Sequence, residues 1–394
     1  MEATLQGIFQ AAFETYAASH KLPLKHHKAA HAIMRCRTEA QGGHEVGCPD
    51  GHEGHIEYHS CRHRSCPKCN AQPKAEWAER QFDRLLPVEH YHVIFTLPHE
   101  LLSLWRYNQR WFVKTFFDVV NRTLTALMKD NKHLGATSGM MMSLHTWGRN
   151  LSLHPHIHCL ITGGGLVGNG EWKKCKNPYL LLGRVVSQLY RGKFLAALWC
   201  AVKAGEINLA GGDTNGAEHQ LKAVGKKKWN VRIQPPYDHG EGVMKYIARY
   251  VKGGAINNQR IQAADEQSVT FGYQDHREGK QKVQRLKLGD FLARVLDHVA
   301  ESHQHVIWHY GLYGHQASVK REQCREVLGH PVQRQHTHAV RVEKCCTVCG
   351  QILTRVREWV KNSLYKVSTS GSVQQADQPH MANAIYFGRP SYIT

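Results

Sequence analysis

The sequence lacks a long hydrophobic run. No apolar stretch follows a basic flank at the N-terminus, and the most apolar segment, residues 189–202, is interrupted by Arg191 and Lys193. A helix that crosses a bilayer needs about 20 consecutive and mostly apolar residues. These absences argue against a signal peptide and a membrane span, so we expect a cytoplasmic protein without a membrane partner.

Acidic residues are also scarce. The 394 residues include 32 Asp and Glu against 51 Lys and Arg, so the formal net charge is +19. Basic side chains displace the counterions condensed on phosphates, and this surplus therefore favours a nucleic-acid partner. Ribosomal proteins and proteins of membrane surfaces share such a charge, so charge alone does not choose among these classes.

The cysteines do not have the pattern of a disulfide framework. Most of the 12 lie within residues 36–69 and 345–349, at short spacings that suit metal ions better than disulfides. This usage indicates a reducing compartment.

Hydrophobic periodicity divides the chain into three parts. We expect an N-terminal helical and zinc-binding domain at residues 1–87, a larger domain at 88–325, and a C-terminal region at 326–394. The last region is polar apart from one cysteine cluster, and its end is expected to be disordered.

Strand and helix patterns are mixed within the larger domain. A single long amphipathic helix is expected through residues 101–128, and the Gly-, Asn- and Lys-rich stretch 205–228 is expected to be a loop. Alternating patterns predict strands in the segments VIFTL, MMMSLHTWG, LHPHIHCLITGGG, WNVRIQPP, VTFGYQ and VQRLKL.

The cysteine-rich segment predicts a zinc site. A tetrahedral zinc ion takes four soft or borderline ligands, and Cys66 and Cys69 form one Cys-x-x-Cys pair. The partner pair is incomplete, because Gly51 stands where a second cysteine would follow Cys48. The segment has too few aliphatic residues to fold around an apolar core without a cross-link.

The two remaining zinc ligands are open from spacing alone. We favour Cys48 and Cys61. The candidates are Cys48, Cys61, His52, His55 and Cys36.

A histidine-rich strand predicts a second metal site. Residues i, i+2 and i+4 of a strand face the same side, so His154, His156 and His158 share one face. Neighbouring imidazoles can hold a divalent ion against a phosphate. Chance is the alternative, because 29 histidines give roughly two His-x-His matches at random and five occur.

Two tyrosines follow on a predicted helix. Tyr246 and Tyr250 are four residues apart, so both hydroxyls lie on one helix face and could reach one pocket. A tyrosine hydroxyl needs a metal ion or cationic neighbours to become a good nucleophile, and Lys245, Arg249 and Lys252 lie on or beside the helix and could bind DNA. Ordinary core packing is the alternative for such a pair.

The order of these motifs resembles the insertion-sequence-91 family of transposases, which belong to the His-hydrophobe-His single-strand endonucleases. The resemblance covers residues 20–320 and departs from the family pattern at Gly51. The motifs that carry it are CRxxxCPxC, HYHVIFTLPHEL, LHPHIHCLITGGG, WNVRIQPPYDHGEGVMKYIARYVKGG, VTFGYQDHREGK and HYGLYG.

The resemblance implies an α+β fold, with a central antiparallel sheet flanked by helices and a small N-terminal zinc-binding module. It implies that His156 and His158 bind the catalytic metal ion, and that Tyr246 and Tyr250 are the nucleophiles of a rolling-circle transposase. The implied cofactors are Mg²⁺ or Mn²⁺ at the histidines and a structural Zn²⁺ at the cysteines. Residues 88–325 would be the catalytic domain.

We therefore expect single-stranded DNA of the transposon ends and target as the partner, with the protein on the nucleoid when bound. We expect one tyrosine to attack the scissile phosphate and to leave a 5′-phosphotyrosine and a free 3′-OH, with Tyr246 preferred for the first attack. A third metal ligand is expected. His154 is the one we name, and the other candidates are His145, His239 and Glu241.

Two further segments carry weaker expectations. Cys345, Cys346 and Cys349 include a Cys-x-x-Cys pair, which His336 and His338 could complete as a second zinc site. Trp229 follows three lysines, residues 226–228, and offers a ring on which unpaired bases could stack.

Three other functions remain open from sequence. A plasmid or phage replication initiator would use the same chemistry. A conjugative relaxase fits less well, because its tyrosine usually precedes the histidines. A zinc-ribbon DNA-binding regulator would explain the charge and the cysteines, but it leaves the strand histidines and the tyrosine pair without a role.

Overall fold

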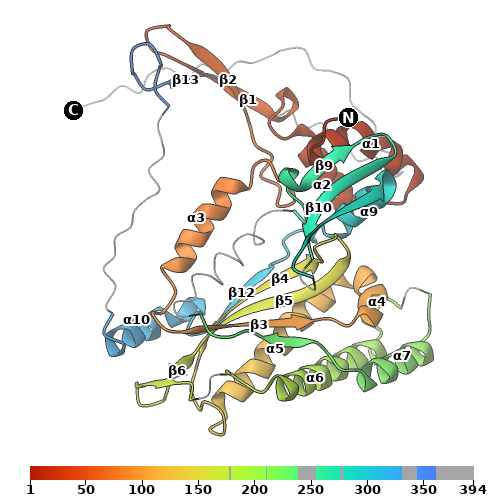
Figure 1. Cartoon of the computed structure of the whole chain (residues 1–394), viewed down its shortest axis with the longest axis vertical. Helices are drawn as coiled ribbons and strands as arrows, with labels where there is room; N and C mark the ends of the chain where they lie inside the picture. Colours follow the sequence, from red (N-terminus) through yellow and green to blue (C-terminus); the bar gives the residue numbers. More distant parts are fainter. Residues whose placement is uncertain (177–178, 210, 238–253, 276–277, 331–343, 361–394) are drawn as a thin grey trace. The chain divides into compact units, whose positions relative to one another are not determined.

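The computed structural model describes the chain except for residues 177–178, 210, 238–253, 276–277, 331–343 and 361–394, and it describes no side chains for residues 71–74 and 360. The chain forms two compact units (Figure 1). Unit 1 comprises Met1–Asn70 and His336–Thr394, and unit 2 comprises Ala71–Gln335. Unit 2 is therefore inserted in the sequence between the two segments of unit 1, whereas the sequence suggested three consecutive parts.

Unit 1 begins with two helices, α1 (Leu5–Ser19) and α2 (Leu24–Arg35). The hydroxyl of Thr4 caps α1 by accepting a hydrogen bond from the backbone N–H of Gly7. The apolar residues of α1 recur at helical spacing and bury one face against α2. The helices are followed by a short 3₁₀ turn, η1 (Glu39–Gln41).

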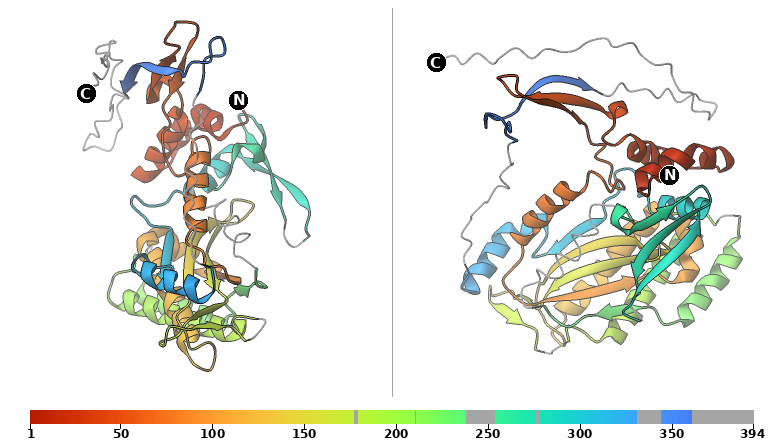
Figure 2. Two further views of the ribbon diagram at one scale, coloured as in Figure 1. Left: turned by 90° about the vertical axis from the view of Figure 1, so that its left-hand side faces the viewer. Right: turned by 45° about the horizontal axis from the view of Figure 1, so that its top comes forward.

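A three-stranded antiparallel sheet completes unit 1. Its order is β13-β1-β2, with β1 (Gly42–Gly47) in the centre, β2 (Gly54–Tyr58) on one side and β13 (Thr354–Val360) on the other. In both views of Figure 2, β13 lies along the strands from the N-terminal segment. The two segments of unit 1 are thus joined in one sheet.

Unit 2 is built on a five-stranded sheet in which every neighbouring pair is antiparallel. The order is β12-β4-β5-β3-β8. The strands are β3 (His90–Thr96), β4 (Gly139–Trp147), β5 (Leu153–Thr162), β8 (Val231–Ile233) and β12 (Ile307–Gly311).

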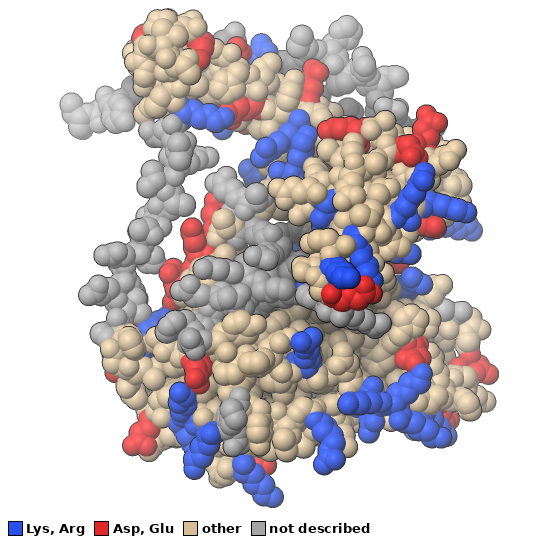
Figure 3. Space-filling view, in the orientation of Figure 1, with Lys and Arg blue, Asp and Glu red and all other residues tan. Residues whose placement is uncertain are grey.

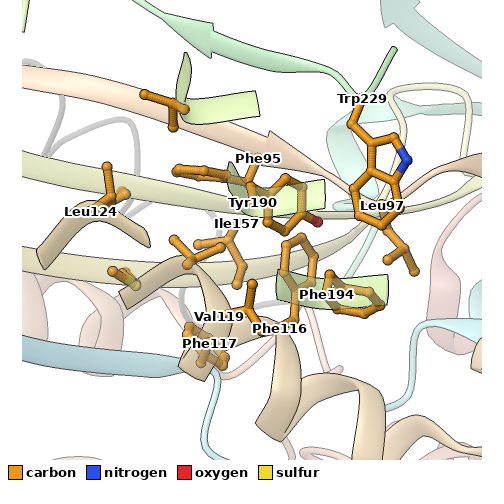
Figure 4. Packing of buried hydrophobic residues seen from close by; sticks show 14 of the residues in the cluster. Phe95, Leu97, Phe116, Phe117, Val119, Leu124, Ile157, Tyr190, Phe194 and Trp229 are labelled. Carbon is orange, nitrogen blue, oxygen red and sulfur yellow. The ribbon is translucent and has the colours of Figure 1, made fainter. Parts of the chain in front are cut away.

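Helices α5 (Gln109–Lys129) and α6 (Gly183–Lys203) cover one face of this sheet (Figure 1). Every second residue of the central strands faces these helices, and these residues are apolar, as a half-buried strand requires. Phe95 and Ile157 of the sheet pack against Phe116, Tyr190 and Phe194 of the helices, as the close view in Figure 4 shows. The histidines of β5 therefore point to the opposite face.

The opposite face of the sheet is apolar at one end and polar at the other. Met141 and Leu160 pack with Leu312 and with Cys324 of α10 (Ser318–Val327). The histidines of β3, β4 and β5 occupy the rest of this face.

The remaining elements of unit 2 surround the sheet. A second antiparallel sheet has the order β11-β10-β9. Its strands are β9 (Ile261–Ala264), β10 (Ser268–Gln274) and β11 (Gln281–Lys287). The other helices are α3 (Ala71–Phe82), η2 (His99–Leu101), α4 (Leu102–Tyr107), α7 (Thr214–Lys226), η3 (Asn258–Arg260), α9 (Leu288–Asp297) and η4 (His315–Ala317). The short strands β6 (Gly164–Leu166) and β7 (Trp172–Lys174) pair with each other.

The predicted fold class is confirmed, because unit 2 is an antiparallel sheet flanked by helices and unit 1 carries a cysteine cluster. Two element predictions were wrong. The long helix is broken at Asn108, whose side-chain amide donates to the carbonyl of Leu104 and so separates α4 from α5. The predicted loop 205–228 contains α7, which begins after Asp213, whose carboxylate caps the helix.

Candidate metal centre and cysteine clusters

Three histidines on neighbouring strands form a compact group in unit 2. His156 and His158 lie on the same face of β5, and His145 on β4 stands directly opposite His156 in the antiparallel register. One ring nitrogen from each lies within 4.8 Å of the others. The group therefore offers three ligand atoms to one ion.

His154, the expected third ligand, is not part of this group. It is exposed, and it contributes its backbone carbonyl instead of its ring: the Nδ1–H of His156 donates to this carbonyl at 2.6 Å. Because Nδ1 carries the proton, the lone pair of His156 is on Nε2. The geometry thus favours His145, another candidate from the sequence, over His154 as the third ligand.

His92 of β3 contacts the group from the other side. Its Nε2 lies 2.8 Å from Nδ1 of His158, and the two rings are stacked with centroids 5.0 Å apart. A hydrogen bond to the second ring nitrogen orients a metal-ligating histidine. His90, two residues earlier, is engaged elsewhere: its ring bonds the hydroxyl of Tyr313 and the carbonyl of Val88.

Burial keeps these imidazoles neutral. Desolvation lowers the pKa of His92 and of His156 to about 4, and it lowers the pKa of His145 and His158 well below the ordinary value. A neutral imidazole is the form that binds a metal ion. The group is therefore ready to coordinate at neutral pH, and an all-imidazole set suits a divalent transition-metal ion better than Mg²⁺.

The predicted nucleophiles fall outside the part of the chain that the structure describes. This holds for Tyr246 and Tyr250, and also for the other sequence candidates between residues 238 and 253. They are Lys245, Arg249, Lys252, His239 and Glu241.

Four cysteines form a cluster in unit 1. The Sγ atoms of Cys36, Cys61, Cys66 and Cys69 all lie within 4.8 Å of one another. The thiols of Cys61, Cys66 and Cys69 lower the pKa of Cys36 through hydrogen bonds, so the cluster favours a thiolate there. The side chain of Asn70 donates to the carbonyl of Cys66 and braces the turn that presents the last two ligands.

Cys36 occupies the place in this cluster that we had assigned to Cys48. In the sequence, Cys36 and Cys61 are each followed by an arginine. Arg37 and Arg62 both adopt the left-handed backbone conformation, with φ of 55° and 53°. The two Cys-Arg pairs thus make similar turns around the same cluster.

Cys48 lies in a different group. Its Sγ is 3.5 Å from Sγ of Cys349 and 3.6 Å from Nδ1 of His52, and Cys346 completes the set. Spacing could not indicate this arrangement, because about 300 residues separate the two halves of the group.

Trp229 is not available for stacking on bases. It is 1% exposed and packs edge-on against Tyr190, with ring centroids 5.0 Å apart. Its indole N–H donates to the carbonyl of Val224. The stacking interpretation was therefore wrong, and Trp229 belongs to the core.

Basic side chains are spread over the surface of unit 2. In Figure 3, Lys and Arg side chains gather over α6 and α7, with fewer acidic side chains among them. Part of this charge is neutralised locally, since Lys222 pairs with Glu218 at 2.7 Å and Lys227 pairs with Glu100.

Among the described residues, no helix combines the length and the apolar character that a membrane crossing requires.

Comparisons with known proteins match two regions of the chain. A family model described as "Putative transposase" matches residues 139–322, which include the histidine group, and one described as "Transposase zinc-binding domain" matches residues 8–97. The second match covers all four ligands of the Cys36 cluster and supports a structural zinc ion in it.

Two curated proteins are similar over most of the chain. A protein of Sinorhizobium fredii with the same description, a putative transposase, is 35% identical over 331 residues, which is 82% of this chain and 83% of the relative. The transposase for insertion sequence element IS801 of Pseudomonas savastanoi pv. phaseolicola is 28% identical over 296 residues, 71% of this chain and 68% of the relative. No solved structure matches.

Proposed function

Because the chain belongs to the insertion-sequence-91 family of transposases, we propose that it cleaves and rejoins single-stranded DNA at element ends by rolling-circle transposition. Transposases of this family act on DNA and cleave it. The observation that carries the finer proposal is the group of His145, His156 and His158, which presents three neutral imidazoles on one sheet face.

The three histidines are the proposed metal site. A divalent ion held there would polarise the scissile phosphate and offset the charge that develops in the transition state. The carbonyl of His154 fixes the tautomer of His156, and the ring of His92 orients His158. The chain's own contribution is thus a preorganised set of ligands on a rigid sheet.

Tyr246 and Tyr250 are the proposed nucleophiles. The phenolic oxygen of one tyrosine forms a bond to phosphorus, the bond from phosphorus to the 3′-oxygen breaks, and the proton lost from the tyrosine is matched by the proton that the 3′-oxygen gains. The products are a 5′-phosphotyrosine and a free 3′-OH, so the bond energy is retained for rejoining. A second tyrosine allows a second cleavage while the first remains bonded to DNA.

An adduct assay tests the nucleophiles. A labelled single-stranded oligonucleotide from an element end, incubated with the protein and Mn²⁺, should give an SDS-resistant adduct that the double variant Tyr246→Phe/Tyr250→Phe does not form. The control is Tyr107→Phe, since Tyr107 is 61% exposed and far in sequence from both. Adduct from the double variant would move the nucleophile elsewhere, and no adduct from the wild type would favour a non-catalytic DNA-binding protein.

A pair of alanine variants tests the metal ligands. His145→Ala removes a proposed ligand, whereas His154→Ala leaves the backbone carbonyl that bonds His156 in place. Mn²⁺ binding, followed by electron paramagnetic resonance, should weaken strongly in the first variant and stay within about threefold in the second, because only the first loses a coordinating atom. The reverse result would exchange the two assignments.

A further inference from the structure

The group formed by Cys48, His52, Cys346 and Cys349 has the geometry of a metal site. Its four ligand atoms lie within 4.8 Å of one another. Zinc bonds of about 2.3 Å to sulfur and about 2.0 Å to nitrogen place neighbouring ligands of a tetrahedron roughly 3.5 to 3.8 Å apart. The separations from Cys48 Sγ, 3.5 Å to Cys349 Sγ and 3.6 Å to His52 Nδ1, agree with that geometry, and Cys346 Sγ lies 4.0 Å from His52 Nδ1.

Both halves of the group are built as tight turns. In the C-terminal half, the backbone N–H of Val348 donates to the Sγ of Cys346, and the N–H of Gly350 donates to the carbonyl of Cys346. Such N–H bonds to sulfur stabilise a thiolate. Gly350 has φ of 74°, a conformation that glycine adopts without strain.

The N-terminal half has the same construction. The N–H of Gly51 donates to the carbonyl of Cys48, and the N–H of Cys48 donates to the carbonyl of Glu53. Gly51 has φ of 76°, a backbone conformation that favours glycine. A side chain there would meet no neighbouring atom, so the backbone conformation and not the available space favours glycine. Gly51 is therefore the turn residue that brings His52 to the group, and His52 supplies the ligand that a cysteine at position 51 would otherwise provide.

Polar contacts join the two turns independently of the sulfur atoms. The carboxylate of Glu53 accepts hydrogen bonds from the backbone N–H of Thr347 at 2.7 Å and from its hydroxyl at 3.0 Å. The side-chain amide of Gln351 donates to Asp50 at 2.8 Å. The four ligands are thus held together by a built interface, and chance proximity of flexible thiols does not explain it.

We propose that Cys48, His52, Cys346 and Cys349 bind a second structural zinc ion. Four protein ligands leave no open position, so the site is structural and not catalytic. Residues 346 and 349 lie outside both matched family regions, which end at residues 97 and 322. Among the described residues, the ligands that join Cys346 and Cys349 are Cys48 and His52 of the N-terminal segment. His336 and His338, which we expected to complete the site, lie outside the described residues.

The proposed ion has a topological consequence. It fastens the segment 344–360 to the N-terminal part of unit 1, where β13 also pairs with β1. The two segments of unit 1, which precede and follow unit 2 in the sequence, are therefore joined in one zinc-stabilised module. This inference concerns the architecture of unit 1 and does not depend on the proposed chemistry at the histidines.

Zinc content of the full-length chain tests the proposal. Elemental analysis should find one zinc ion in each cysteine group of unit 1 of the wild-type chain, in addition to any ion that the histidine group of unit 2 takes up. Relative to the wild type, Cys346→Ser and Cys349→Ser should each lose one ion and Cys345→Ser should lose none, because Cys345 is a direct sequence neighbour that is not a member of the group. An unchanged zinc content in the Cys346 variant would overturn the proposal.

Differential alkylation tests it without any substitution. In the zinc-loaded wild type, Cys48, Cys346 and Cys349 should resist iodoacetamide and become reactive only after chelation, whereas the exposed Cys345 should react in both states. Mass spectrometry of the tryptic peptides distinguishes the adjacent cysteines. Equal reactivity of Cys345 and Cys346 in the zinc-loaded protein, or a disulfide between Cys48 and Cys349, would contradict the proposed site.

Discussion

The two units solve the problem of holding strands together in different ways. In unit 2, the central strand β5 buries Ile157 and Cys159 under α5 and α6, and both residues are fully inaccessible. In unit 1, the buried positions of the central strand β1 are glycines, Gly42, Gly43 and Gly47, and four of the five residues of β2 are exposed. The sheet of unit 1 therefore has almost no apolar core of its own.

Close packing in unit 1 is achieved with small residues and bound ions. A side-chain carbon on Gly43 would lie 2.9 Å from the ring of Trp359 and 2.9 Å from the carbonyl of Glu57, so only glycine fits between the neighbouring strands. Apolar side chains of the outer strands are exposed to solvent: Ile56 of β2 is 51% exposed and Val356 of β13 is 55% exposed. Where burial cannot stabilise a sheet, metal ligands can, because the free energy of binding becomes free energy of folding.

Zinc chelation should reveal the difference in stability between the two units more strongly than any substitution. Structural zinc sites contribute on the order of 10 kcal/mol at neutral pH, which exceeds what the small core of unit 1 can replace. After zinc removal, hydrogen exchange should show lost amide protection in β1, β2 and β13 and retained protection in β4 and β5. Restored protection on adding Zn²⁺ is the control, and unchanged protection in a chain proven free of zinc would break the comparison.

Phe194→Ala should act on unit 2 alone. Phe194 is fully buried and contacts the rings of Phe112, Phe116 and Trp229, so its truncation should cost about 3 to 5 kcal/mol in the free energy of unfolding. Urea unfolding measures the change, and zinc content should stay at the wild-type value.

The matched control for this substitution is Val319→Ala, at a position that is 79% exposed on α10. Its effect should stay within about 0.5 kcal/mol. Loss of zinc from the Phe194 variant would show that the units are not stabilised separately.

Local patterns in the sequence predicted the strands β3, β4, β5, β8, β10 and β11, but not the other described strands. The alternation in β5 placed its histidines on one face and Ile157 and Cys159 on the other, and the register of the sheet agrees. The error at α7 had a local signal as well. Ala217, Leu221 and Val224 recur at helical spacing and are buried, but the glycines and lysines around them suggested a loop.

Pairings between distant segments could not be predicted. His145 meets His156 only because of the register of β4 against β5, which shifts between His145 and Trp147. A shift of one residue would turn His145 to the other face. Cys48 and Cys349 likewise meet through the pairing of β1 with β13, which no spacing within the N-terminal segment encodes.

The smallest expected effect concerns acid stability within unit 2. His309 on β12 bonds the side-chain oxygen of Gln81 at 2.9 Å, and burial lowers the pKa of His309 from 6.5 to about 4. Between these values the unfolded chain binds a proton that the folded chain does not. The stability associated with His309 is therefore complete above about pH 6.5 and is lost progressively as the pH falls toward 4.

His309→Gln removes this titration and keeps a side chain that can bond Gln81. The free energy of unfolding of the variant should fall less steeply between pH 7 and pH 5, by about 1 kcal/mol, because a partly exposed group loses part of its effect to solvent. Urea unfolding of the zinc-loaded chain at several pH values measures the slope, and comparison with the wild type cancels the other histidines. Identical slopes would show that His309 is protonated as easily in the folded chain as in the unfolded chain. The surroundings of His309 would then be more accessible to water than the burial of its side chain indicates.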